Sequence, residues 1–332
     1  MNTCVAELWE QASKDCHPAH TFAADLAGIP CEFSSSCEWT IDLFRQLLCH
    51  HRLDHGSDDA CTHQIVIVAA EDIKDFPRQH GTPLWSGRLT DGTPVSITAS
   101  GDYTRHLQVG SEVSILTNGA KGHTICRIGE TPVEPMLSRR PRPDGYFLPL
   151  LQFLLSSYHI YVLHASAVAF QNHAMAFLGP SGAGKTTLSL ALARAGMAFM
   201  GDDLIAVATQ NGEIVAHALL FHSKVERVPG QTKEIVDSIT TERLDVCHTA
   251  RLAGVAALHK TSEMVSNFAE VSTMQTLTWL LQQANDVRFM REPQDWVDTA
   301  SAIAHAIPGW IWTVGPPDTV DICAVKEKML WG

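Results

Sequence analysis

The residues best suited to chemistry lie in the stretch FLGPSGAGKTTLSL, residues 177–190. Its glycines let the backbone turn N–H groups inward onto phosphate oxygens, and the helix-forming run behind them adds its positive end. Lys185 can reach the outer phosphates, and the Thr186 hydroxyl is placed to bind Mg²⁺. The pattern predicts a phosphate-binding loop made of Gly179, Pro180, Ser181, Gly182, Ala183, Gly184, Lys185, Thr186 and Thr187.

Two adjacent carboxylates follow this loop. Asp202 and Asp203 lie 17 and 18 residues after Lys185, at the end of the short apolar run 197–201. If that run is a strand lying beside the strands that lead to the loop, both carboxylates come near the outermost phosphate. An acid there can orient and deprotonate an acceptor hydroxyl, as kinases require. Motor and switch ATPases usually take their metal-binding Asp from a strand much later in the chain.

The elements that must position these residues alternate between strands and helices. We expect strands at 163–170 and 174–179 joined by a tight turn, a helix at 186–196 closed by Gly196, and a strand at 197–201. His164 falls on the first of these strands, and its spacing alone leaves a packed or solvent-facing role open. Further elements are expected at 204–209, 214–221, 252–259, 272–286, 294–306 and 310–314. This alternation indicates an α/β nucleotide-binding domain over residues 141–332.

Residues 1–140 have a different character. Short β-like runs at 64–70, 94–100 and 111–117 are separated by turn residues, which indicates a smaller mixed α+β domain. The stretch 138–145 has three Arg, two Pro and one Gly without an apolar face, so we place the domain junction there. Because the second domain has no spare stretch of binding character, we expect residues 1–140 to recognise the substrate.

Composition limits the partners and the compartment. A formal net charge of −12 offers no basic surface for nucleic acid or anionic lipid. Polar residues and Pro149 interrupt the most apolar segment, 146–170, so no membrane span is expected. The nine cysteines are odd in number and include no CxxC pair, which favours reduced thiols and a cytoplasmic protein. The cysteines and histidines between Cys49 and His63 fit no standard zinc spacing.

The stretch LHASAVAFQNHAMAFLGPSGAGKTTLSLALARAGMAFMGDDLIAV resembles the catalytic half of HPr kinase/phosphorylase and the related peptide kinases of modified-peptide pathways. In that family a His opens the strand before the loop, and an Asp-Asp pair closes the strand after the loop helix. The resemblance is tight over residues 163–208 and looser from 145 to about 320. It implies an HPr-kinase-like fold for the C-terminal domain.

The resemblance also implies roles for single residues. The loop with Lys185 would bind ATP, and Thr186 would hold Mg²⁺. Asp203 would accept the proton of the substrate hydroxyl, Asp202 would support the metal or the geometry, and His164 would line the phosphate site. Glu226 is the nearest candidate for a further metal ligand, although its surroundings do not match the family motif.

The loop ends in Lys-Thr-Thr rather than Lys-Ser-Glu, and the N-terminal half shows no clear match. The resemblance therefore points to the divergent members, and to phosphorylation of a serine on a peptide or small protein. A small-molecule kinase with the same loop stays an alternative, as does a nucleotide-binding regulator that transfers no phosphate. The sequence names neither the acceptor nor the oligomeric state, and it leaves a homo-oligomer and a reverse phosphorylase reaction open.

Overall fold

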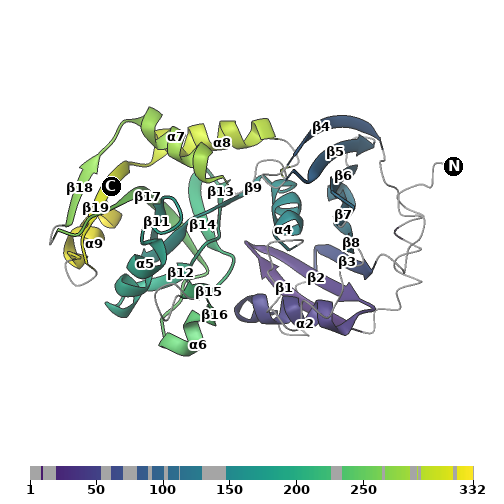
Figure 1. Cartoon of the computed structure of the whole chain (residues 1–332), viewed down its shortest axis with the longest axis horizontal. Helices are drawn as coiled ribbons and strands as arrows, with labels where there is room; N and C mark the ends of the chain where they lie inside the picture. Colours follow the sequence, from purple (N-terminus) through teal and green to yellow (C-terminus); the bar gives the residue numbers. More distant parts are fainter. Residues whose placement is uncertain are drawn as a thin grey trace. The chain divides into compact units, whose positions relative to one another are not determined.

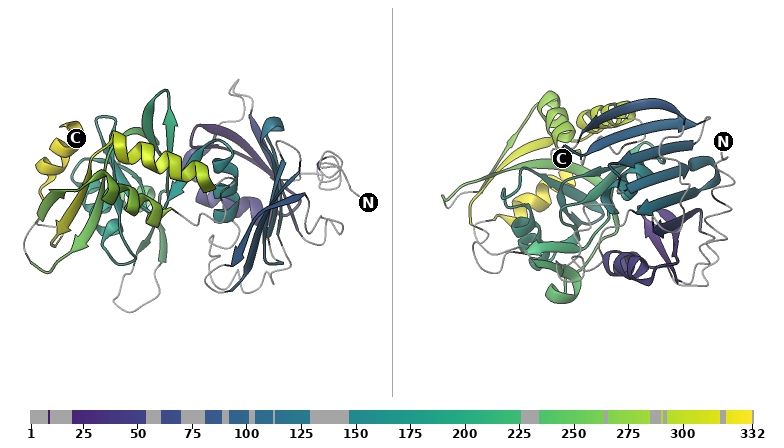
Figure 2. Two further views of the ribbon diagram at one scale, coloured as in Figure 1. Left: turned by 90° about the horizontal axis from the view of Figure 1, so that it is seen from above. Right: turned by 45° about the vertical axis from the view of Figure 1, so that its right-hand side comes forward.

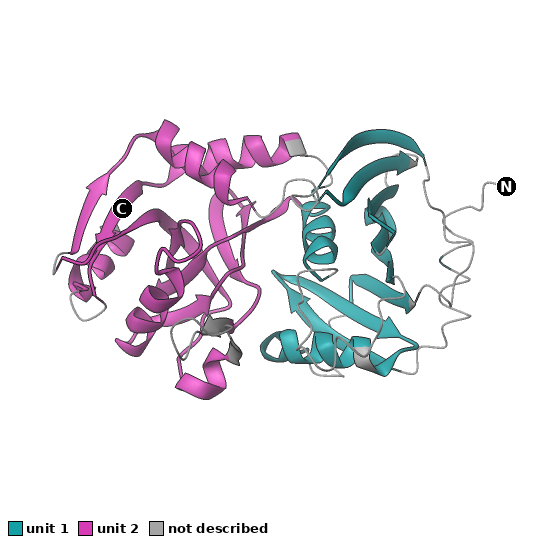
Figure 3. Ribbon diagram, viewed as in Figure 1, with its two compact units in different colours: residues 1–158, 286–291 teal, residues 159–285, 292–332 magenta. Residues whose placement is uncertain are grey.

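The computed structural model describes residues 9, 20–53, 61–69, 81–88, 92–100, 104–111, 113–128, 147–225, 234–263, 266–284, 290, 293–316 and 320–331 (Figure 1). The expected domain junction at 138–145 and Glu226 lie outside these residues. The chain forms two compact units, residues 1–158 with 286–291 (unit 1) and residues 159–285 with 292–332 (unit 2) (Figure 3). The helix Phe147–Ser156, which the sequence assigned to the second domain, therefore belongs to unit 1.

Unit 1 is built on an eight-stranded sheet of order β1-β2-β3-β8-β7-β6-β5-β4, in which β3 is parallel to both its neighbours and the other pairs are antiparallel. Its elements are β1 (His20–Leu26), β2 (Ile29–Ser35), α2 (Glu38–Leu47), η1 (Cys49–His51), β3 (His63–Ala69), β4 (Thr82–Arg88), β5 (Pro94–Ser100), β6 (Thr104–Val109), β7 (Val113–Asn118), η2 (Gly119–Lys121), β8 (His123–Ile128) and α4 (Phe147–Ser156).

The helices α2 and α4 lie on one face of this sheet (Figure 2), and aromatic side chains hold them together. Phe33 of β2 stacks on Phe44 of α2 with ring centroids 4.9 Å apart, and Phe44 contacts Phe147 of α4 at 5.2 Å. All three rings are buried. Such pairs contribute about 0.5–1.5 kcal/mol beyond their buried area, so α2 and α4 are held by one shared core.

Unit 2 contains a nine-stranded mixed sheet and a two-stranded one. Its elements are β9 (Ile160–Leu163), β10 (Ser166–Phe170), β11 (His173–Leu178), α5 (Lys185–Arg194), β12 (Ala198–Gly201), β13 (Ile205–Gln210), β14 (Glu213–Ala218), β15 (His222–Val225), β16 (Glu234–Asp237), α6 (Ser238–Glu242), β17 (Thr249–Lys260), β18 (Ser266–Glu270), α7 (Thr273–Gln283), α8 (Pro293–Ala306), β19 (Gly309–Val314) and α9 (Ile322–Trp331).

The large sheet runs β12-β10-β11-β17-β14-β13-β9, and β19 joins it by pairing with β17 and β18. One core cluster combines Leu188 and Leu192 of α5 with Val325 and Met329 of α9 and with Trp312 of β19. Both helices therefore pack on the same face of the sheet. The structure confirms the mixed α/β architecture and the elements expected around residues 174–201, 272–286, 294–306 and 310–314.

The single strand expected at 163–170 is wrong. The chain forms β9 and β10 instead, with His164 and Ala165 between them. Strand β9 pairs with β13, whereas β10 pairs with β11 and β12. The chain therefore changes partners at His164, whose N–H bonds to the Gln283 carbonyl at 2.8 Å. The local composition of residues 163–170 cannot show such a change, because pairing partners are distant in sequence.

Among the described residues, no helix combines the length and the apolar character needed to span a membrane.

We expect Gly201→Ala to destabilise the protein by roughly 2 kcal/mol, measured by urea unfolding. Gly201 has φ 145°, and an added Cβ would lie 2.8 Å from the backbone oxygen of Leu220. Gly212→Ala is the matched control, because Gly212 also has a positive φ but no atom within 4 Å of an added Cβ. Equal losses of stability in the two variants would show that the contact with Leu220 contributes nothing.

Candidate functional site

Strand directions gather the predicted site residues at one edge of the unit 2 sheet. Strand β10 is antiparallel to both β11 and β12, so β11 and β12 run in the same direction. The loop after β11 and Asp202 after β12 therefore leave the sheet at the same edge, and His164 enters β10 there. The carboxyl ends of parallel strands are where α/β proteins bind ligands.

The loop itself is shaped by three glycines. Gly179, Gly182 and Gly184 have φ values of 146°, 85° and 97°, which L side chains rarely adopt. Ala183 N–H closes the turn on the Pro180 carbonyl at 3.1 Å. Gly184 is the N-cap of α5 and has no side chain to satisfy the first N–H groups of the helix. Such helix ends are ready-made anion sites.

Lys185 is buried beneath the loop with 6% of its surface exposed. Its ammonium donates to the Gly179 carbonyl at 2.7 Å and to the Pro180 carbonyl at 3.4 Å. It also lies 3.2 Å from Nε2 of His164. An ammonium has only donors, so this contact requires an imidazole whose Nε2 carries its lone pair. The structure thus places His164 directly beside the loop lysine.

Thr186 connects the loop helix to the acidic pair. Its Oγ1 donates to Oδ1 of Asp202 at 3.0 Å. The Asp202 side chain is fully buried, and its Oδ2 has no hydrogen-bond partner among the described residues. Burial raises the pKa of Asp202 to about 6, helped by the neighbouring charge of Asp203 and opposed by the Thr186 hydrogen bond. A buried carboxylate with a free oxygen is costly unless something compensates its charge.

Asp203 differs from its neighbour. It is partly exposed, and its φ of 66° is unusual for a residue other than glycine. The Asp202 carbonyl accepts a bond from Leu204 N–H at 2.8 Å, which closes a tight turn around Asp203. Strained backbone of this kind clusters at functional sites.

The remaining predicted residues divide into two groups. Pro180, Ser181 and Thr187 are exposed at the loop, where a ligand could contact them. Glu226 lies outside the described residues, so its assignment as a metal ligand stays a prediction. The sequence missed Gly201, whose conformation places Asp202; the only signal was a glycine directly before the acidic pair.

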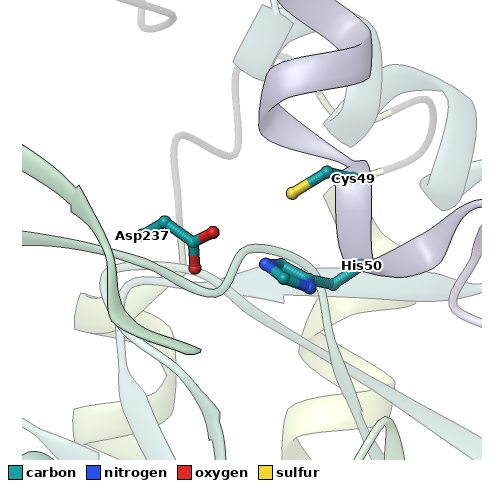
Figure 4. Close-up of side chains that lie close together, drawn as sticks. All are labelled: Cys49, His50 and Asp237. Carbon is teal, nitrogen blue, oxygen red and sulfur yellow. The ribbon is translucent and has the colours of Figure 1, made fainter. Parts of the chain in front are cut away.

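The stretch between Cys49 and His63, which fits no standard zinc spacing, belongs to unit 1. Cys49 and His50 lie in η1 of unit 1, whereas Asp237 is the N-cap of α6 in unit 2 (Figure 4). Asp237 already accepts bonds from the N–H groups of Ile239 and Thr240 at 3.0 and 3.3 Å. These capping hydrogen bonds account for the position of the Asp237 carboxylate, so no bound cation is needed to explain it.

Comparisons with known proteins add little to this geometry. No protein-family profile matches the sequence, and no curated protein is similar to it. Among solved structures, the HPr(Ser) kinase/phosphatase from Coxiella burnetii aligns with 51% of this chain and 90% of its own, at 15% identity and a TM-score of 0.33. A similarity at that TM-score establishes no function, so the site has to be interpreted from its own residues.

The buried Asp202 predicts a pH dependence of stability in the absence of divalent cations. Its pKa is about 6 in the folded protein and about 4 when unfolded. Between these values the folded state holds a proton that the unfolded state has lost, so the free energy of unfolding falls as pH rises. Asp202→Asn lacks this loss, and we expect its stability relative to wild type to improve by on the order of 2 kcal/mol from pH 4 to 6.5.

Urea unfolding of both proteins in EDTA across this range measures the difference. Thr186→Val removes the hydrogen bond that lowers the pKa of Asp202, so its pH-dependent loss of stability should extend to higher pH. Parallel curves for wild type and Asp202→Asn would contradict the prediction.

Proposed function

We propose that unit 2 is a Mg-ATP-dependent phosphotransferase acting on a hydroxyl group. The observation that carries the proposal is the meeting of two contacts at one sheet edge: Lys185 with His164, and Thr186 with Asp202. The loop supplies backbone N–H groups for phosphates, and the ammonium of Lys185 supplies a fixed positive charge beside them.

The residues present fit a magnesium ion. Mg²⁺ prefers oxygen ligands, and the Thr186 hydroxyl and Asp202 carboxylate supply two of them 3.0 Å apart. Oδ2 of Asp202, which has no hydrogen-bond partner in the part of the chain that the structure describes, is a buried acceptor that a cation would satisfy. Bound there, the ion would neutralise charge on the nucleotide phosphates. A cation also lowers the pKa of a neighbouring carboxylate, which would keep Asp202 ionised at neutral pH.

This arrangement separates the roles of the two carboxylates. Asp202 is buried and engaged with Thr186, so a substrate hydroxyl cannot easily reach it. Asp203 is partly exposed and is the better candidate for the general base. In the proposed reaction the acceptor oxygen bonds to the γ-phosphorus, the bond to ADP breaks, and the acceptor proton passes to the Asp203 carboxylate.

A serine of a peptide or small protein is the acceptor that the resemblance of residues 163–208 favours. A small-molecule hydroxyl would suit the same chemistry. Radiolabel transfer from γ-labelled ATP to candidate peptides and metabolites decides between them, and label on a metabolite alone would replace the serine assignment.

We expect Asp203→Asn to lower the rate of phosphate transfer by about 10²-fold or more, because a positioned base contributes that much. Affinity for Mg-ATP should stay within several-fold of wild type, whereas Lys185→Ala should lose most of it. Asp202→Asn should show a rate partly recovered at high Mg²⁺. Single-turnover transfer and nucleotide titration measure these effects.

The matched control is Asp298→Asn, which makes the same change at an exposed position of α8. Transfer at the wild-type rate by Asp203→Asn would remove the base assignment. If wild type binds Mg-ATP but labels no hydroxyl, the protein is better described as a nucleotide-binding regulator.

We further propose that unit 1 recognises the acceptor. It has a core and a sheet of its own, and every predicted site residue that the structure describes belongs to unit 2. A chain of residues 159–332 should therefore keep ATP affinity and lose acceptor affinity by about tenfold or more. Circular dichroism establishes that this fragment folds, and full-length Lys185→Ala controls for acceptor binding without nucleotide. Unchanged acceptor affinity in a folded fragment would count against this role.

A further inference from the structure

A cavity of about 340 Å³ lies beside the start of α5. Small-molecule sites typically measure ~300–1,000 Å³, so this volume can hold one small organic group. It is bounded by the loop and α5 on one side and by the chain after β17 and β19 on the other. Its lining residues are Ala183, Gly184, Thr187, Leu188, Leu258, Lys260, Thr261, Ser262, Val314, Gly315 and Pro316.

The far wall of the cavity is fixed by strand pairing. Strands β17 and β19 are parallel over Val255–Lys260 and Gly309–Val314, and β17 is also parallel to β11. All three strands therefore end at the edge that holds the loop. Thr261 N–H donates to the Val314 carbonyl at 3.0 Å and joins the two strand ends, and Thr261 Oγ1 accepts from Glu263 N–H at 3.2 Å. This wall is thus already formed.

The walls and the rim of the cavity differ chemically. Leu188, Leu258 and Val314 are between 3% and 9% exposed and present apolar surface. Thr187, Lys260 and Ser262 are exposed and carry groups that donate hydrogen bonds, and two of them also accept. An apolar slot with a few polar groups at its rim suits a flat ring with polar edges.

The position of the cavity decides which part of a ligand it takes. The sheet order β12-β10-β11-β17 places Asp202 and Asp203 on one side of the loop strand and the cavity on the other. An acceptor hydroxyl must lie beside Asp203, so it approaches on the β12 side. The cavity is continuous with the loop through Ala183, Gly184 and Thr187.

We propose that this cavity binds the base and sugar of the nucleotide whose phosphates lie on the loop. The inference rests on the proposed function and extends it by naming the residues that distinguish a nucleotide from a bare polyphosphate. Ser262 and Lys260 stand at the rim, where they contact the nucleoside.

The test compares ATP with inorganic tripolyphosphate, which has the phosphates but no nucleoside. Ser262→Trp places a large ring at the rim of the cavity, and Glu263→Trp makes the same change at the next exposed residue, which does not line it. By calorimetry with Mg²⁺, we expect Ser262→Trp to change ATP affinity by about tenfold or more while tripolyphosphate affinity stays within about twofold. Glu263→Trp should leave both affinities at wild-type values.

A gentler pair of variants gives a second measurement. In Ser262→Cys, ATP should protect the new thiol from maleimide, detected by mass spectrometry of its peptide, whereas tripolyphosphate should not. Glu263→Cys should react equally with either ligand present. These cysteines disturb the cavity little, so the result does not depend on tolerance of a tryptophan.

Three outcomes would overturn the inference. If ATP affinity is unchanged in Ser262→Trp and ATP gives no protection to Ser262→Cys, the nucleoside lies elsewhere, while loss of ATP binding in Lys185→Ala would keep the proposed function. If ATP and tripolyphosphate lose affinity together, the variant acts on the loop and not on a separate cavity. If wild type binds neither ligand, the proposed function fails and the inference with it.

Discussion

The hydrogen bond between Thr186 and Asp202 joins the two halves of the candidate site. Thr186 lies in the first turn of the helix that follows the loop, and Asp202 directly follows the strand that comes after this helix. The contact therefore links the two ends of the segment that runs from the loop after β11, through α5, to the end of β12. It fixes the distance between the phosphate loop and the acidic pair. It also leaves a buried carboxylate with one oxygen unpartnered among the described residues. Burying such a group costs free energy, so folding alone does not account for it.

This contact is possible only because of how α5 ends. Ala195 and Gly196 stop the helix, and Gly196 takes a φ of 87° that L side chains rarely adopt. Gly196 N–H bonds to Ala193 and Met197 N–H to Leu192, which turns the chain back toward the sheet. Strand β12 then pairs with β10 rather than with β11. One intervening antiparallel strand is what allows β12 to run in the direction of β11 and deliver Asp202 to the loop.

Local sequence patterns predicted much of the candidate site, because each of these patterns spans only a few neighbouring residues. The glycines and Lys185 identify the loop, the apolar run before Gly196 identifies α5, and the acidic pair marks the end of β12. Strand order depends on contacts between distant residues, so the break at His164 could not be seen in the local sequence of residues 163–170. The cavity was missed for the same reason, since residues near 188, 260 and 315 meet only after β17 and β19 pair.

The two carboxylates show how a site can differ from the fold that holds it. Asp202 is buried without full compensation, and Asp203 is held at φ 66°. Neither feature is explained by packing, because an amide at the first position and a glycine at the second would fold with less strain. Strain stored beside a phosphate-binding loop is consistent with a ligand that relieves it. A cation on Asp202 would supply the missing partner, and the turn at Asp203 would present the second carboxylate outward, toward an approaching hydroxyl. The burial of Asp202 and the turn at Asp203, both unfavourable for folding, would therefore position the metal ligand and the general base together.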